Sequence, residues 1–169
     1  MKLFLLLCSV AFALGAAAAE RVISLSPSLT EAICLLGGES MLVGRTDSCT
    51  EPASVVRLPS VGKFLSPSME RIAALAPTLV VSTPQPGRGT AQLLTSLGIR
   101  FEELPDHTLA DYPALLRRLG RLLNLPAGER EAALAEKRLA HLRHQMESIP
   151  IQIIPNRFIN RPQIFFVHH

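Results

Sequence analysis

Residues 60–83 constrain the fold more than any other stretch, because they join a helical pattern directly to an unbroken apolar run. Ser66 and Pro67 predict a helix start, with a Ser cap and a Pro in the first turn, where its missing N–H costs nothing. Apolar residues then recur at helical spacing until Pro77, which ends the helix. Residues 79–81 are all apolar, as expected of a strand covered on both faces. This order predicts an α/β fold.

The remaining pattern alternates short strands with helices. We predict strands at residues 22–25, 41–44 and 99–104. The first and the last lead into helices, whereas an irregular loop at residues 45–59 follows the second. Ser28 and Glu31 have the spacing of a capping box. These strands and helices predict a parallel sheet.

The helices after residue 89 carry leucines at helical spacing. In the helix predicted at residues 90–97, the side chains expected to point inward are Leu93, Leu94 and Leu97. A longer helix at residues 126–148 would span roughly 35 Å. Its narrow apolar stripe consists of Leu134, Leu139 and Leu142.

The N-terminus has the pattern of a secretory signal. Residues 1–19 begin with Lys2, continue with an apolar run and end in alanines suited to cleavage before Glu20. The alternative, a membrane anchor, needs a run long enough to cross about 30 Å, and this one is too short. A lipoprotein signal needs a small residue before Cys8, whereas Leu7 stands there. We therefore predict an exported soluble protein.

Export places the chain in an oxidising compartment, where cysteines can pair. Cleavage would leave Cys34 and Cys49. A bridge between them would stabilise the fold by roughly 3 kcal/mol in the chain-entropy model. The other interpretation, which we prefer, is that both are small buried hydrophobes.

Composition excludes some functions. The 169 residues allow one domain, and the chain has no Trp and only 5% aromatic residues, so stacking platforms for nucleic acid are scarce. The net charge is +3, and the basic residues are scattered along the sequence. There is no nucleophile elbow, no HExxH and no CxxC, so we predict a protein that is not an enzyme and has no catalytic residues. His141 and His144 share a helix face, but we expect a solvated pair and no metal site.

Three blocks carry a family resemblance: RVISLSPSLTE at residues 21–31, VGRTDSC at 43–49, and PSVGKF with SMERIAALAPTLVV within 59–81. In this order the chain resembles the N-terminal lobe of periplasmic substrate-binding proteins of ABC importers. The subgroup has a helical backbone and captures cobalamin, ferric siderophores or haem.

The resemblance implies a fold and a division of the chain. Residues 20–125 would be a Rossmann-like α/β lobe, with a parallel sheet and helices on both faces. Residues 126–149 would be the rigid helix that joins two lobes. Residues 150–169 would begin a C-terminal lobe that is otherwise missing, so the chain resembles a truncated member.

The resemblance also implies roles for single residues. The expected ligand wall consists of Ser26, Ser28, Thr30, Ser48, Phe64 and Thr83. Phe64 is either a ligand contact or part of the core, because an apolar ring is costly to leave in water. Glu70 would dock on arginines of the permease, the alternative being a solvated surface carboxylate. Asp47 has a local role in either of two forms, pairing with Arg45 or capping the turn.

The sequence thus predicts a monomeric binding component, without a cofactor, that works with an ABC permease and its ATPase. Its ligand would be cobalamin or a related chelate, with a ferric siderophore or haem as the alternatives. A third possibility is a lone lobe that contacts a partner and has no transport role.

Overall fold

Four parallel strands form the central sheet of the structure, a computed structural model that describes residues 20–84, 89–106 and 108–148. Its strands, in spatial order, are β2 (Leu42–Arg45), β1 (Val22–Ser24), β5 (Leu79–Ser82) and β6 (Arg100–Glu103). A small antiparallel hairpin, β3 (Gly62–Lys63) and β4 (Ser66–Pro67), follows β2. The predicted parallel sheet is confirmed.

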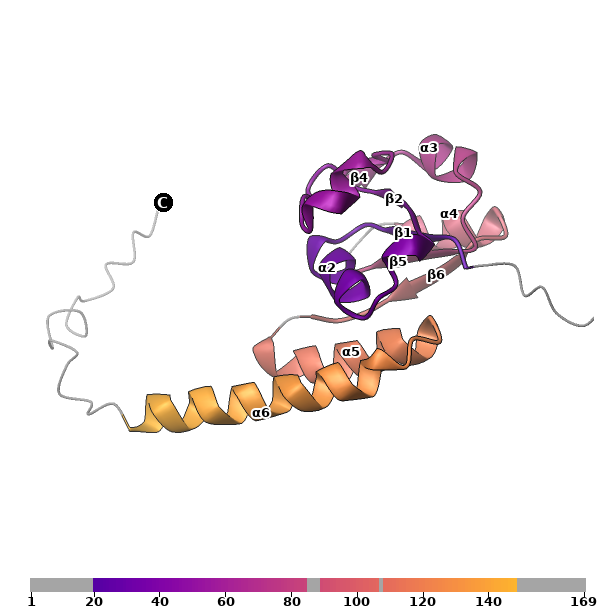
Figure 1. The fold of residues 1–169 in the computed structure, drawn as a ribbon. Helices are drawn as coiled ribbons and strands as arrows, with labels where there is room; N and C mark the ends of the chain where they lie inside the picture. The colour runs from indigo at the N-terminus through magenta and orange to yellow at the C-terminus, as the bar shows by residue number, and fades with distance from the viewer. Residues whose placement is uncertain (1–19, 85–88, 107, 149–169) are drawn as a thin grey trace, which may run out of the picture.

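The strands are linked by helices, which Figure 1 shows around the sheet. The α-helices are α2 (Pro27–Leu35), α3 (Met69–Ala74), α4 (Thr90–Ser96), α5 (Tyr112–Leu122) and α6 (Ala127–Glu147). Short 3-10 helices are η1 (Glu39–Met41), η2 (Ala53–Arg57) and η3 (Leu109–Asp111).

Both faces of the sheet are buried, because successive side chains of a strand point to opposite faces. Val22 of β1 belongs to a core that includes α2 and α5, whereas its neighbour Ile23 belongs to a second core with α3 and α4. β5 divides in the same way, with Leu79 in the first core and Val80 in the second. Helices therefore cover both faces, as predicted for a Rossmann-like lobe.

The predicted start of α3 is two residues too early. Ser66 and Pro67 pair with the strand before them, and the N-cap is Ser68, whose side chain accepts a hydrogen bond from the backbone N–H of Arg71 at 3.2 Å. Ser66 and Pro67, which the sequence pattern assigned to the start of the helix, therefore belong to the hairpin. The helix ends at Ala74, before Pro77 as expected.

Two other helix predictions also need correction. The side chains of Ser28 and Glu31 form no capping box; Ser26 is the N-cap of α2, and no side chain caps the helix. Of the three leucines expected to point inward, only Leu94 is buried, because one face of the short helix α4 meets the sheet. Leu93 is 46% exposed, and Leu97, the C-cap that follows the helix, is 49% exposed.

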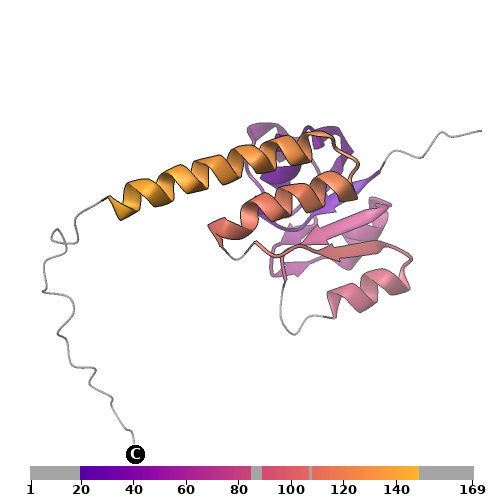
Figure 2. The same ribbon diagram turned by 90° about the horizontal axis from the view of Figure 1, so that it is seen from below.

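The long predicted helix is confirmed, since α6 has 21 residues. Figures 1 and 2 both show it beside α5, with its C-terminal half extending past the sheet. The two backbones touch where Gly120 faces Gly128, since a Cβ at either glycine would lie 2.8 Å from the other's Cα. Arg117 of α5 also binds two carboxylates of α6, Glu129 and Glu136.

Cys34 and Cys49 are not bridged to each other. Cys34 is half-buried on α2, and Cys49 is fully buried, with its sulfur 3.2 Å from the hydroxyl oxygen of Thr46. This arrangement agrees with the preferred interpretation, although Cys34 keeps part of its surface exposed. The predicted signal at residues 1–19 and the predicted second-lobe segment at 150–169 lie outside the described residues.

Candidate functional site

The carboxyl ends of the four parallel strands meet at one edge of the sheet, which is where open α/β sheets place ligands. Four segments follow these ends: residues 25–28, whose last two belong to the first turn of α2, and the turns at residues 46–49, 83–84 and 104–106. Five of the six residues predicted to form the ligand wall lie in these segments or in the adjoining hairpin. Their side chains differ in exposure and in hydrogen bonding.

A chain of hydroxyl and carboxylate groups crosses the end of β5. The hydroxyl oxygens of Ser26 and Ser28 lie 2.9 Å apart, and Ser28 donates a short hydrogen bond to a carboxylate oxygen of Asp106. Since β5 lies between β1 and β6, this contact joins the turns of two strands that are not neighbours. Ser26 is 4% exposed, whereas Ser28 and Asp106 are half-buried.

Asp106 was absent from the predicted set. Its one sequence signal is its position two residues beyond Leu104, where the strand predicted at residues 99–104 ends. The same reasoning that selected Ser26 after β1 applies to a carboxylate after β6.

Thr30 does not face the edge. It is fully buried, and its hydroxyl oxygen lies 2.9 Å from that of Ser24 and 3.0 Å from the backbone oxygen of Ser26. The structure therefore gives no support for a direct ligand contact by Thr30. Its hydroxyl holds the Ser26 turn in place from inside the lobe.

The turn after β2 is tied to the hairpin that carries Phe64. The backbone N–H of Asp47 donates to the carbonyl of Gly62 at 2.9 Å, and the Ser60 hydroxyl donates to the Asp47 carboxylate. Ser48 is exposed in this turn, and Phe64 is half-buried between β3 and β4. Ser48 and Phe64 thus belong to two loops that are held together.

Arg45 does not pair with Asp47, which was one of the two predicted local roles. Its guanidinium donates to the carbonyls of Val55 and Val56 at 3.0 and 2.8 Å, and so anchors the loop before the hairpin. Thr46 supports the same turn from below, because its hydroxyl donates to the carbonyl of Leu25 at 3.3 Å.

Thr83 and Glu70 occupy different positions. Thr83 directly follows β5 and is 8% exposed, so little of it is accessible from the edge. Glu70 is exposed in the first turn of α3. It therefore lies on the outside of a helix and not in the turns at the sheet edge.

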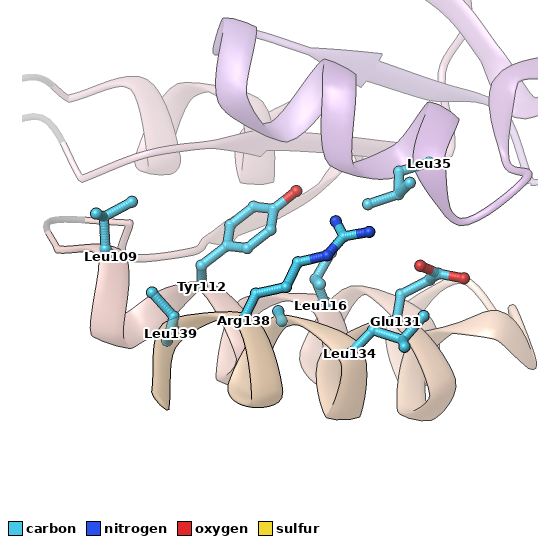
Figure 3. A pocket seen from close by; sticks show the side chains of 9 residues that line it. Leu35, Leu109, Tyr112, Leu116, Glu131, Leu134, Arg138 and Leu139 are labelled. Carbon is cyan, nitrogen blue, oxygen red and sulfur yellow. The ribbon is translucent and has the colours of Figure 1, made fainter. Parts of the chain in front are cut away.

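A separate apolar hollow, about 170 Å³ in volume, lies between α2, η3, α5 and α6 (Figure 3). Burial and the nearby carboxylates of Glu31 and Glu131 raise the pKa of Tyr112, which lines it. Cys34 lies beside it on α2, and burial followed by Glu39 and Glu31 raises the pKa of its thiol to about 11. Sequence reasoning missed this hollow, although the stripe of α6 forms one of its walls.

The described residues hold no group of three or more His, Cys, Asp or Glu side chains suited to a metal ion. His141 and His144 are both exposed on α6. Within the same residues, no helix combines the length and the apolar character needed to cross a bilayer.

Comparison with known sequences gives a consistent result. A family described as "Periplasmic binding protein" matches residues 22–153. The vitamin B12-binding protein of Pectobacterium carotovorum is 34% identical over 146 residues, which are 85% of this chain and 51% of that protein. The chain therefore spans about half the length of the curated relatives it matches.

Solved structures show the same partial match. The periplasmic vitamin B12 binding protein of Vibrio cholerae superposes with a TM-score of 0.70 at 29% identity, over 77% of this chain and 52% of that one. A periplasmic heme binding protein of Pseudomonas aeruginosa gives 0.65 at 31% identity, over 76% and 46%.

Proposed function

Since this chain belongs to the periplasmic binding protein family, we propose that its carboxyl-edge turns form one wall of a cleft for cobalamin or a related metal chelate. The observation that carries this proposal is the Ser26–Ser28–Asp106 chain, which fixes polar groups along the edge of the sheet. Relatives that match the chain are named for binding vitamin B12 or haem. Haem and ferric siderophores are therefore the alternative ligands.

The proposed wall would consist of two groups of residues. One group lies after β1, β5 and β6 and comprises Ser26, Ser28, Thr83 and Asp106. The other lies in the turn after β2 and in the hairpin and comprises Ser48 and Phe64. The half-buried ring of Phe64 offers apolar contact to a planar macrocycle, and the hydroxyls offer hydrogen bonds to its polar edge. One wall encloses only one side of such a ligand, so affinity would be lower than in a cleft closed by two lobes.

The proposed role is capture outside the inner membrane and delivery to an ABC permease and its ATPase. Residues 1–19 would direct export, and α6 would join this lobe to a second one that begins near residue 150. Glu70 would dock on the permease, since its carboxylate is exposed at the start of α3. The chain would bind its cargo and would not transform it.

Calorimetric titration with cyanocobalamin, haemin and ferrichrome tests the ligand class. We expect heat with at least one of them and a weaker response in Phe64→Ala and in Ser48→Ala. Ser96→Ala is the matched control for Ser48→Ala, because Ser96 lies on α4, outside the turns at the sheet edge. A folded chain that gives no heat with any of the three contradicts the proposal.

Glu70 is tested separately, by co-sedimentation with proteoliposomes that hold a vitamin B12 permease. Glu70→Lys should lower the bound fraction, whereas Glu103→Lys makes the same charge change at another exposed position, at the end of β6. An equal loss of the bound fraction in both variants would show that Glu70 is not part of the docking surface.

A further inference from the structure

The tip of the β3–β4 hairpin consists of two large apolar residues, Phe64 and Leu65. Lys63 pairs with Ser66 across the hairpin, so these two residues are the whole turn. Two-residue hairpin turns normally contain glycine or asparagine, because the favoured turn types need positive φ angles. Neither Phe64 nor Leu65 has a positive φ angle. The needs of the turn therefore do not explain why these two residues stand there.

Leu65 is also left in water, since it is 56% exposed. The described residues include nine exposed large hydrophobic residues, and Leu65 is the one that lies in the hairpin or in the segments after the parallel strands. A single exposed leucine is common on protein surfaces, but in a two-residue turn it also displaces a residue that the turn prefers. Positions at which a sequence breaks a local rule in this way are expected at functional sites.

Hydrogen bonds at the base of the hairpin hold it beside the carboxyl edge of the sheet. The backbone N–H of Val61 donates to the carbonyl of Arg45, the last residue of β2, at 2.8 Å. The backbone N–H of Ser68 donates to the carbonyl of Val61 at 2.7 Å. Gly62, which accepts from the N–H of Asp47, has a φ angle of 106°, a conformation that glycine adopts readily. The tip is therefore carried by a fixed base, next to the turn after β2.

The tip is continuous with the proposed ligand wall. Phe64 belongs to both, and the turn that carries Ser48 is bonded to the base of the hairpin. A ligand that touches Phe64 therefore lies next to Leu65, the following residue in the turn. Covering the exposed part of this leucine would stabilise the complex, because it removes apolar surface from water.

We propose that Leu65 is a specificity residue of the cleft, and that with Phe64 it favours a ligand with a broad apolar face, as the ring of a corrin or a porphyrin has. This inference rests on the proposed function, because it needs a ligand at the carboxyl edge. A ferric hydroxamate siderophore surrounds its iron with oxygen atoms and presents amide groups, which lose water and gain no hydrogen bond at an apolar tip. The hairpin thus selects macrocycles over siderophores.

Replacing Leu65 by asparagine separates a ligand contact from a structural role. Asparagine suits a turn better than leucine, so the urea midpoint of unfolding should stay the same or rise in Leu65→Asn. Calorimetric titration should show a dissociation constant about fivefold higher than in the parent for whichever macrocycle binds, cyanocobalamin or haemin. Ferrichrome should bind the parent more weakly than that macrocycle does, or give no heat.

Leu97→Asn is the matched control, because Leu97 is 49% exposed and is the C-cap of α4, just before the amino end of β6. It should leave every dissociation constant unchanged. If Leu65→Asn binds the macrocycle as tightly as the parent, the role of Leu65 is refuted and the proposed function stands. A lower urea midpoint in Leu65→Asn refutes that role as well, since the leucine would then support the fold, and so does a parent that prefers ferrichrome. A folded parent that gives no heat with any of the three ligands overturns both.

Discussion

Replacing Gly120 by alanine tests whether the backbone contact between α5 and α6 sets the direction of the long helix. A Cβ at Gly120 would lie 2.8 Å from the Cα of Gly128 and 3.1 Å from the carbonyl oxygen of Leu125. Both neighbours are backbone atoms, which cannot rotate away as the end of a side chain can. The methyl group therefore forces the two helices apart.

Two opposing effects set the size of the change. Replacing glycine by alanine within a helix normally raises stability by up to about 1 kcal/mol. Overpacking at a tight contact costs about 1–3 kcal/mol. The backbone contact is too close to relax locally, so we expect a net loss of about 1–2 kcal/mol in the free energy of unfolding, or roughly 4–8 °C in Tm.

Urea unfolding followed by far-ultraviolet circular dichroism measures this loss. Gly128→Ala should show a similar one, because its Cβ would meet the Cα of Gly120 at the same 2.8 Å. Gly89→Ala is the control, since its Cβ would meet only the side-chain oxygen of Gln92, at 3.9 Å. If Gly120→Ala is as stable as the parent while Gly89→Ala is neutral, the close contact does not exist.

Three further predictions follow from single side chains. Thr30→Val should lower the free energy of unfolding by about 1 kcal/mol, because it removes the buried hydrogen bond to Ser24; urea titration measures it. Hydrogen bonding to Arg117 lowers the pKa of Glu136 from its usual 4.5, so this stabilisation is present above that value and is lost as the pH falls through the lower folded pKa. Unfolding curves of Glu136→Gln and the parent should thus differ at neutral pH and converge in acid. The pKa of about 11 keeps the Cys34 thiol protonated at pH 8. Iodoacetamide should therefore modify it much more slowly than a thiol of ordinary pKa, and mass spectrometry measures the rate.

The parallel sheet was predictable because its signals are local. The apolar run at residues 79–81 and the alternation of short strands with helices need no knowledge of distant contacts. The start of α3 was not predictable in this way, because Ser66 and Pro67 suit a helix start as well as a strand end. Pairing with Gly62 and Lys63 decides between them, and a hairpin with two residues per strand leaves no periodic pattern.

The same distinction, between local signals and contacts of distant residues, explains which parts of the candidate site could be predicted. The turns after β1 and β2 could be selected from the sequence because each directly follows an apolar run. The bond between Ser28 and Asp106 joins residues 78 positions apart, so only the sheet order β1-β5-β6 brings them together. Thr30 lies one helical turn after Ser26, and its burial depends on Ser24 beneath it, which spacing alone does not reveal.

The hydrogen bonds between turns bear directly on how a ligand would bind. The turn after β1 is held to Asp106 and, through Thr46, to the turn after β2, which is itself held to the Phe64 hairpin through Asp47. The segments after β1, β2 and β6 and the Phe64 hairpin are thus held to one another before any ligand arrives. Little conformational freedom remains to be lost when the proposed wall is occupied, so less of the binding free energy would offset ordering. Selectivity among macrocycles would then depend on the side chains that stay accessible, above all Ser48 and Phe64, and less on movement of the loops that carry them.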